Sequence, residues 1–118
     1  MAALTESGLP GCRALEGYTG VWAPQRGAGQ PPAKIASIGV KVDARGITRH
    51  GFSLNVQPDM CYWQGIIGCG LSDTPVTSLA ELMPAAPVMQ VVEQAVAAAF
   101  GREFDFKLVE DYLPENRF

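Results

Sequence analysis

The stretch KIASIGVKVDARGITRHGFSLNV, residues 34–56, has the pattern of a β-hairpin. Apolar side chains alternate with small or polar ones in both of its halves, at Ile38, Val40, Val42, Phe52, Leu54 and Val56. Residues 43–46, between the halves, have the composition of a tight turn. Polar side chains nevertheless interrupt the pattern at Lys34, His50 and Asn55. Such residues belong in a core strand only if they are hydrogen-bonded there or have a functional role.

The sequence before the hairpin predicts little regular structure. Residues 2–6 are expected to form a short helix, and residues 19–23 a short strand that enters the interior. Residues 24–32 are rich in proline and glycine and are therefore expected to form a loop.

Two short helical segments are expected after the hairpin. The proline that opens residues 58–66 favours one or two helical turns. Residues 76–82 predict a short helix with Thr77 or Ser78 near its N-cap, because Glu81 follows at the spacing of a capping box.

Residues 86–100 predict the longest helix of the chain. Its apolar side chains fall on one face, at Val88, Val91, Val92, Ala95, Val96, Ala99 and Phe100. Pro87 suits the first turn of this helix, and Gly101 is expected to end it. Residues 103–109 then alternate apolar and polar side chains, which predicts a last strand.

These elements predict an α+β or mixed α/β fold, with a central mixed sheet of about four strands and flanking helices. The 118 residues, 47% hydrophobic and 18% charged, are expected to form one globular domain or part of one. The net charge of -3 and the absence of a basic run argue against a nucleic-acid partner. No apolar stretch reaches the roughly 18 residues of a membrane span. Because the first residues also lack the pattern of a secretory signal, we expect a cytoplasmic protein.

The three cysteines differ in their surroundings. Cys12, Cys61 and Cys69 are too widely spaced for a disulfide framework or a C-x-x-C site, and a single histidine argues against a zinc site. We expect Cys12 and Cys61 to be ordinary, non-catalytic cysteines. Cys69 lies between Gly68 and Gly70, and glycines let the backbone turn sharply and approach a ligand closely.

Cys69 and Lys34 each have two interpretations. A cysteine in a glycine-rich turn is either a small buried residue or a thiol presented to a substrate. A lysine that opens an apolar strand either protects a sheet edge or acts on a nearby group. An ammonium beside a thiol lowers the thiol's pKa, so a Lys–Cys pair would supply a thiolate without a histidine. His50 and Asn55 are expected to be satisfied polar groups rather than parts of a Cys–His protease site.

Five segments keep a distinctive order and spacing: GVWA (20–23), KIASIG (34–39), HGFSLNV (50–56), CGL (69–71) and VTSL (76–79). In these segments the chain resembles the octanoyltransferase (lipoyl-octanoyl transferase) family of lipoate biosynthesis. The resemblance extends from about residue 17 to residue 82. It implies a partial biotin/lipoate ligase-like catalytic domain.

The resemblance implies a two-step acyl transfer that needs no metal or redox cofactor. Octanoyl passes from acyl carrier protein to a cysteine as a thioester, and then to a lysine of an apo lipoyl domain. The acceptors of the family are the lipoyl domains of 2-oxoacid dehydrogenases and the glycine cleavage H protein. Matched residue by residue, Cys69 takes the place of the nucleophile and Lys34 that of the lysine that activates it.

The resemblance also implies an acyl channel along the hairpin. The matched substrate-binding residues are Ser37, Ile38, Gly39, Gly51, Phe52 and Ser53. The apolar residues of the hairpin are expected to hold the acyl chain, and its polar residues to face the reacting thioester. A docking patch for the carrier protein should be basic, which makes Lys41, Arg45 and Arg49 candidates; exposed charges in a turn are the alternative interpretation.

The chain departs from the family pattern at two points. Gly68 stands where family members commonly have proline, which would loosen the turn that presents Cys69. The arginine–glycine–glycine segment and the HGPGQ-like stretch of the family's N-terminal half have no match, although QRGAGQ, residues 25–30, is faintly similar. We therefore expect the C-terminal half of the domain, with apolar sheet surface left uncovered. The chain is then either an acyltransferase or a non-catalytic remnant or interaction half that needs a partner chain.

Overall fold

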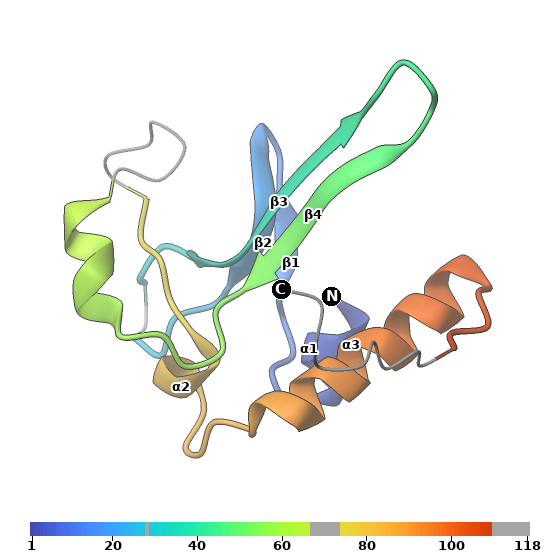
Figure 1. The fold of residues 1–118 in the computed structure, drawn as a ribbon. Helices are drawn as coiled ribbons and strands as arrows, with labels where there is room; N and C mark the ends of the chain where they lie inside the picture. Colours follow the sequence, from blue (N-terminus) through green and yellow to red (C-terminus); the bar gives the residue numbers. More distant parts are fainter. Residues whose placement is uncertain (28, 67–73, 110–118) are drawn as a thin grey trace, which may run out of the picture.

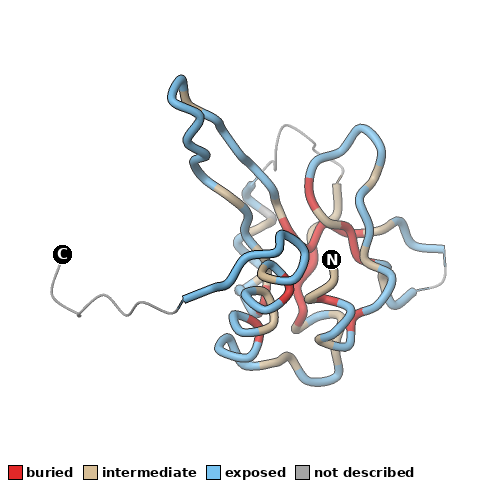
Figure 2. The backbone as a smooth tube through the Cα atoms, turned by 90° about the vertical axis from the view of Figure 1, so that its right-hand side faces the viewer, coloured by how far each residue is buried: buried red, intermediate tan, exposed pale blue. Residues whose placement is uncertain are grey.

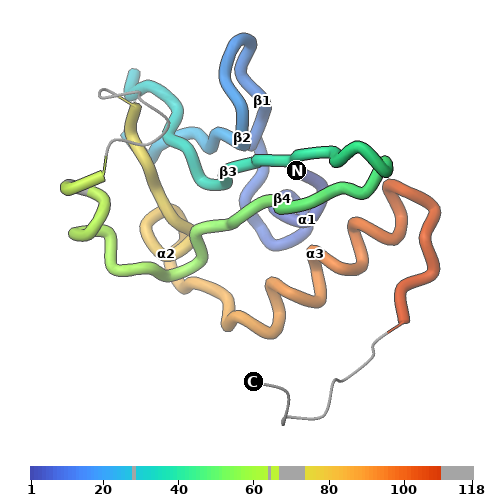
Figure 3. The backbone as a smooth tube through the Cα atoms, turned by 45° about the horizontal axis from the view of Figure 1, so that its top comes forward, coloured from blue at the N-terminus to red at the C-terminus, as the bar shows by residue number. Residues whose placement is uncertain are grey.

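The computed structural model of this protein describes residues 1–27, 29–66 and 74–109 (Figure 1). Along the chain they form α1 (Ala2–Glu6), β1 (Arg13–Leu15), β2 (Tyr18–Ala23), β3 (Ala33–Val42), β4 (Thr48–Leu54), the 3-10 helix η1 (Met60–Gly65), α2 (Leu79–Leu82) and α3 (Met89–Phe104). The strands make one antiparallel sheet in the order β1-β2-β3-β4, and α1 packs against α3 (Figures 1 and 3). The prediction of an α+β fold is confirmed. Parallel pairing in the described residues is limited to a bridge between Lys34 and Val76.

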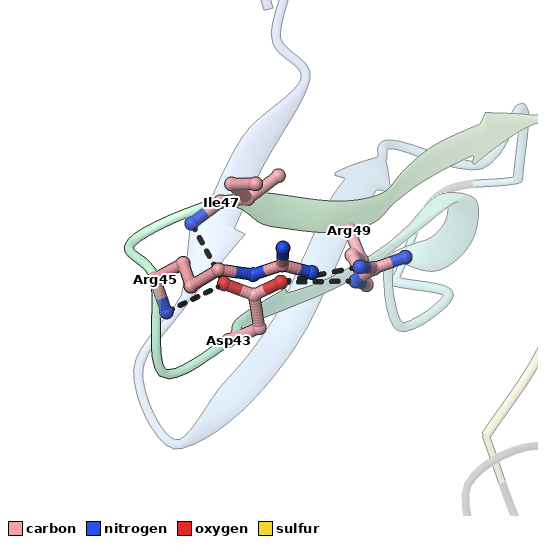
Figure 4. Close-up of polar contacts among 4 residues, drawn as sticks. All are labelled: Asp43, Arg45, Ile47 and Arg49. Atoms are coloured by element: carbon pink, nitrogen blue, oxygen red, sulfur yellow. Dashed lines mark hydrogen bonds and ion pairs between the residues drawn. The ribbon is translucent and has the colours of Figure 1, made fainter.

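β3 and β4 form the predicted hairpin. Their register is continuous over the seven residue pairs that join them. Asp43 organises the turn, because its Oδ1 accepts hydrogen bonds from the backbone N–H groups of Arg45 (2.9 Å) and Ile47 (3.0 Å) (Figure 4). Gly46 completes the turn with φ +78°, a conformation that favours glycine.

The hairpin divides into a buried base and an exposed arm, which we define as residues 38–52. Residues 33–36 of β3 are buried, whereas residues 38–42 of the same strand are all exposed. Figure 2 shows the arm projecting from the body of the molecule, with buried residues at its base. The arm therefore contributes little to the core.

The core lies between the base of the sheet and the helices. Its buried side chains are Leu4, Leu9, Ala23, Ile35, Ala36, Val56, Leu79 and Val92. Leu79 opens α2, whose N-terminus is capped as predicted. The Ser78 hydroxyl accepts the Glu81 N–H at 3.3 Å, and the Thr77 hydroxyl donates to the Glu81 carboxylate at 3.0 Å.

The other short elements are also confirmed. α1 covers the predicted residues, β2 contains the predicted strand at 19–23, and the described part of 24–32 has no regular structure. The predicted helical turns after the hairpin are η1. Asp59 caps this helix by accepting the N–H of Cys61 at 3.0 Å.

Gly101 does not end the long helix. α3 continues to Phe104, and Asp105 then takes the left-handed conformation (φ 55°, ψ 42°) that terminates it. The Phe106 N–H donates to the Gly101 carbonyl at 2.9 Å, which closes the end of the helix. The glycine is explained by crowding, since a Cβ at this position would lie 3.0 Å from the Phe106 carbonyl oxygen.

The prediction of a strand at 103–109 is wrong. The first two of these residues belong to α3, and residues 106–109 form no strand. The apolar spacing instead allows aromatic packing: Phe100 and Phe104 lie one helical turn apart with ring centroids at 4.5 Å, and Phe106 stacks on Phe104 at 6.3 Å. The fourth strand of the sheet is β1, which is too short to show a period in the sequence.

α3 buries only part of its predicted apolar face. Val92 and Ala99 are buried and Val96 is partly buried against the core. Val88 and Val91 are 67% and 50% exposed, so apolar surface remains uncovered on the helix as well as on the arm. None of the helices in the described part of the chain has the length and hydrophobicity needed to cross a bilayer.

Candidate functional site

Lys34 lies where three segments of the chain meet. On one side it pairs with Trp22 of β2. On the other side, its N–H donates to the Pro75 carbonyl at 2.8 Å, and its carbonyl accepts the Thr77 N–H at 2.9 Å. The main chain of Lys34 is therefore held by β2 and by residues 75–77 at once.

The side chain of Lys34 is buried, with 7% of its surface exposed. Its Nζ lies 5.0 Å from the centre of the Trp22 ring, where an ammonium is attracted by the negative face of the aromatic system. The aliphatic stem passes Gly20, since a Cβ there would lie 3.3 Å from Lys34 Cε. Neither of the two ion pairs found among the described residues includes Lys34. In this part of the chain the amine is held by an aromatic face rather than by a carboxylate.

Trp22 is the main residue of this site that sequence reasoning missed. It is only 3% exposed and packs edge-on against Tyr18, with ring centroids 5.7 Å apart. Its indole Nε1 is buried and has no hydrogen-bond partner among the described residues. The place of Trp22 in a predicted strand was visible in the sequence, but its position opposite Lys34 depends on a register that shifts between Val21 and Trp22.

The structure places the six predicted substrate-binding residues directly opposite one another. In the β3–β4 ladder, Ser37 pairs with Ser53, Ile38 with Phe52, and Gly39 with Gly51. Because side chains alternate along a strand, the Ile38–Phe52 pair lies on the same face of β3 as Lys34. At about 3.3 Å per residue, Ile38 is about 13 Å along β3 from Lys34.

This face of the arm carries an exposed row of apolar side chains, which we call the apolar strip. Its members and their exposed fractions are Ile38 (47%), Val40 (59%), Val42 (61%) and Phe52 (55%). The expectation of uncovered apolar sheet surface is therefore confirmed. The strip and the Lys34 side chain lie on the same face of β3.

His50 and Asn55, the other polar residues of the hairpin, have different settings. Asn55 joins the base of the hairpin to the segment beyond it: its Nδ2 donates to the Thr77 carbonyl at 3.0 Å, and its own carbonyl accepts the Leu79 N–H at 3.0 Å. It is a satisfied polar group, as expected. His50 is exposed and has φ 69°, and Gly51 follows with φ 150°. Two successive residues with positive φ are unusual in a strand, and backbone strain of this kind is often kept at functional positions.

The structure describes two of the three cysteines, Cys12 and Cys61. Cys69 lies outside the described residues. Burial raises the pKa of the partly buried Cys12 thiol, and the hydrogen bond to Asp59 raises the pKa of the exposed Cys61 thiol. Both thiols are therefore biased towards the protonated form.

An open hollow of about 420 Å³ lies at the end of α3. It is lined by Ala97, Ala98, Gly101, Arg102, Asp105, Phe106 and Leu108. It shares no residue with the surroundings of Lys34 and contains neither a thiol nor a hydroxyl nucleophile. The hollow therefore offers no chemistry that competes with the Lys34 site.

Comparison with known families identifies the domain. Residues 1–101 match the family described as the lipoyl protein ligase A/B catalytic domain. The chain belongs to this family. The match covers most of the chain and confirms the resemblance noted in the sequence.

Curated relatives named octanoyltransferase share close sequence similarity with the chain. The relative from Nostoc punctiforme is 46% identical over 115 residues, which is 98% of this chain and 45% of the relative. That from Chloroflexus aggregans is 44% identical over 102 residues (86% and 43%), and that from Salinispora tropica is 53% identical over 66 residues (56% and 30%). The chain thus spans less than half the length of these relatives.

Proposed function

We propose that this chain carries the acyl-transfer chemistry of an octanoyltransferase, moving octanoyl from acyl carrier protein to a lysine of an apo lipoyl domain through a thioester on Cys69. One observation carries the proposal: the buried amine of Lys34 lies on the same strand face as an exposed apolar strip, in a chain of the lipoyl protein ligase A/B family. In a reaction between a thiol and a fatty acyl thioester, the amine can accept the proton of the thiol, and the apolar surface can hold the acyl chain.

In the first step, Lys34 favours the thiolate of Cys69 by accepting its proton and remaining beside it as an ammonium. The thiolate attacks the carbonyl carbon of the carrier-bound octanoyl group. A new C–S bond forms, the old C–S bond breaks, and the carrier leaves as a thiol after it takes up the proton held by Lys34, which becomes a neutral amine again. Since one thioester replaces another, the step is nearly isoenergetic and depends on orientation and on the fraction of thiolate.

In the second step, the amine of the lipoyl-domain lysine attacks the thioester on Cys69. A C–N bond forms and the bond between the acyl carbon and the Cys69 sulfur breaks, which yields an amide and leaves Cys69 as a thiolate. The proton lost by the attacking amine passes to Lys34 or to the leaving thiolate. The lipoyl domains of 2-oxoacid dehydrogenases and the glycine cleavage H protein are the proposed acceptors, and the cytoplasm is the proposed location.

The apolar strip gives the acyl chain a binding surface. Ile38 and Phe52 face each other across the ladder, and Gly39 and Gly51 beside them carry no side chains. Each buried methylene of the acyl chain contributes roughly 0.8 kcal/mol, so contact along the strip would favour a medium-length chain over acetyl.

The proposal is tested by incubating the chain with octanoyl-acyl carrier protein and measuring the mass of the intact protein. We expect one octanoyl adduct that hydroxylamine removes. The adduct should be absent from the Cys69→Ser variant and present in the matched Cys61→Ser variant, which removes an exposed thiol instead. Lys34→Ala should slow adduct formation at least about tenfold by removing the proton acceptor. An adduct on Cys12 or Cys61, or none at all on the folded chain, would refute the proposed chemistry.

The uncovered apolar surface favours a second candidate function, that of a binding half that acts only with a partner chain. The strip and the exposed part of α3 leave large apolar side chains in water. Coexpression with the portion of the Nostoc punctiforme relative that the match leaves uncovered distinguishes the two functions. If the chain acts only as such a half, the two pieces should copurify and the octanoyl adduct should form only in the complex.

A further inference from the structure

The arm carries positive charge on an acidic protein. Residues 41–49 contain three basic side chains and one acidic side chain, whereas the whole chain has nine basic and twelve acidic residues and a net charge of -3. The three basic residues, Lys41, Arg45 and Arg49, are all exposed. Positive charge is therefore concentrated at the part of the molecule that projects furthest from the core (Figure 2).

The geometry of the turn crowds these charges together. Lys41 and Arg49 lie directly opposite each other in the ladder, an arrangement of like charges that destabilises a strand pair. Asp43 is the only carboxylate in this stretch and accepts hydrogen bonds from Arg49 Nε (3.4 Å) and Nη2 (3.2 Å). Figure 4 shows the Arg45 side chain extending past this carboxylate towards Arg49. The stretch thus contains three basic side chains and one carboxylate, and this carboxylate pairs with Arg49. An excess of positive charge is therefore available to a partner.

The basic residues and the apolar strip occupy different faces of the arm. By strand alternation, Lys41 and Arg49 point away from the face that carries Val40 and Val42. A partner bound to the basic residues would therefore leave the strip free for an acyl chain. Lys41 is seven residues from Lys34, about 23 Å along β3 at about 3.3 Å per residue, so a thioester delivered from the tip has to reach about that far to meet the amine.

We propose that the basic tip of the arm, formed by Lys41, Arg45 and Arg49, is the docking surface for the acidic carrier protein that delivers the octanoyl group. This inference rests on the proposed function and names the residues that receive its donor. Exposed charges at such a tip act over long range, so they accelerate encounter with an acidic partner and orient it before the thioester reaches Lys34.

The test is a titration of the full chain with octanoyl-acyl carrier protein by calorimetry at low and at physiological ionic strength. The K41E/R49E variant keeps a like-charged pair in the ladder while inverting its sign. We expect it to bind the carrier at least about tenfold more weakly at low salt and to lose most of the salt dependence. The matched R13E/K107E variant changes the net charge equally at exposed positions outside the arm, and it should bind as the unaltered chain does.

The Asp43→Asn variant tests the proposal in the opposite direction. Asparagine keeps the oxygen that accepts the Arg45 and Ile47 N–H groups but removes the negative charge, so carrier binding should become tighter. Equal binding by the unaltered chain, K41E/R49E and Asp43→Asn would overturn the docking surface. A short DNA duplex that competes with the carrier as effectively as a second carrier molecule would overturn the choice of an acidic protein.

A small donor separates this inference from the proposed function. S-octanoyl-N-acetylcysteamine carries the thioester without the carrier protein and should acylate the unaltered chain and K41E/R49E at equal rates. With octanoyl-acyl carrier protein, K41E/R49E should be at least about tenfold slower. If the unaltered chain and K41E/R49E react at equal rates with each donor, the docking surface is refuted and the proposed function is not. If neither donor acylates the unaltered chain, the proposed function is refuted. The calorimetric titration then still decides whether the carrier binds the tip.

Discussion

The two halves of β3 belong to one continuous strand but have opposite surroundings. Ile35, in the base, is fully buried in the core, whereas Ile38, Val40 and Val42, in the arm, are about half exposed or more. The pairing with β4 continues through the arm without a change of register. Alternation therefore identifies a strand and its faces, but it does not show whether a second layer of structure covers either face.

The largest effect is expected from equivalent truncations in the two halves. Ile35→Ala leaves a cavity in the core and should lower the free energy of unfolding by about 2–5 kcal/mol. Ile38→Ala removes a side chain that is 47% exposed and should cost only about 0.5 kcal/mol. Urea denaturation followed by circular dichroism measures both. A loss at Ile38 as large as that at Ile35 would show that the arm is packed in solution, and its dependence on protein concentration would reveal self-association.

The parts of the fold that sequence predicted are those that depend on neighbouring residues. The hairpin was predicted because turn chemistry around Asp43 and alternation on both sides of it act locally, and α2 because Ser78 and Glu81 stand at capping distance. Local rules failed where tertiary contacts decide. Phe104 and Phe106 have the spacing of a strand, yet Phe104 packs against Phe100 within α3.

The candidate site was predictable in its residue types but not in its geometry. The family resemblance pointed to Lys34 and to the two hairpin segments, and their residue-by-residue pairing followed from the register once the strands were placed. The position of Lys34 over Trp22 was not predictable, because it depends on a shift in the β2–β3 register. Cys69 remains a prediction of the sequence, since it lies outside the described residues.

Two glycines with positive φ show that the backbone is more crowded around Gly20 than around Gly46. At Gly20, in β2 next to the base, an added Cβ would lie 2.5 Å from the Ala36 carbonyl oxygen, and φ is +114°. At Gly46, in the arm, φ is +78° but no atom lies within 4 Å of an added Cβ. Gly46→Ala should therefore cost about 1–2 kcal/mol for its conformation alone, and Gly20→Ala should cost more because the backbone must also move. Thermal denaturation of both variants measures the difference, and equal losses would contradict the close approach of β2 and β3.

Substitutions of Trp22 test whether the buried residues around the base also position the amine of Lys34. Trp22→Leu removes the aromatic face 5.0 Å from Lys34 Nζ, a contact of about 0.5–2 kcal/mol, and should slow alkylation of Cys69 by iodoacetamide several-fold. Trp22→Phe keeps an aromatic face and should restore most of the rate. Phe52→Leu, on the arm, is the control and should leave the rate unchanged. If Trp22→Phe and Trp22→Leu are equally slow, the indole N–H rather than the ring face is the important feature.

The smallest expected effect is a change in the arm with pH that leaves the base unaffected. Hydrogen bonds from the Ile47 and Arg45 N–H groups, together with the Arg49 side chain, lower the pKa of Asp43. Because the pKa of Asp43 is lower in the folded state than in the unfolded state, its carboxylate stabilises the turn at pH values above the unfolded pKa of about 3.9. This stabilisation is lost as the pH falls through the folded pKa. The Ile47 amide should therefore exchange faster, relative to its intrinsic rate, as the pH falls below about 4. The Leu79 amide, bonded to Asn55 at the base, should remain protected.

The Asp43→Asn variant is the matched control for this titration. Asparagine keeps an acceptor for both backbone N–H groups but does not titrate in this range, so the protection of the Ile47 amide should no longer depend on pH. If Ile47 and Leu79 lose protection together in the unaltered chain, the arm and the base unfold as one unit. In that case the exposed arm is stabilised by the core through the continuous β3–β4 ladder, and the division of β3 into two halves describes its exposure but not its stability.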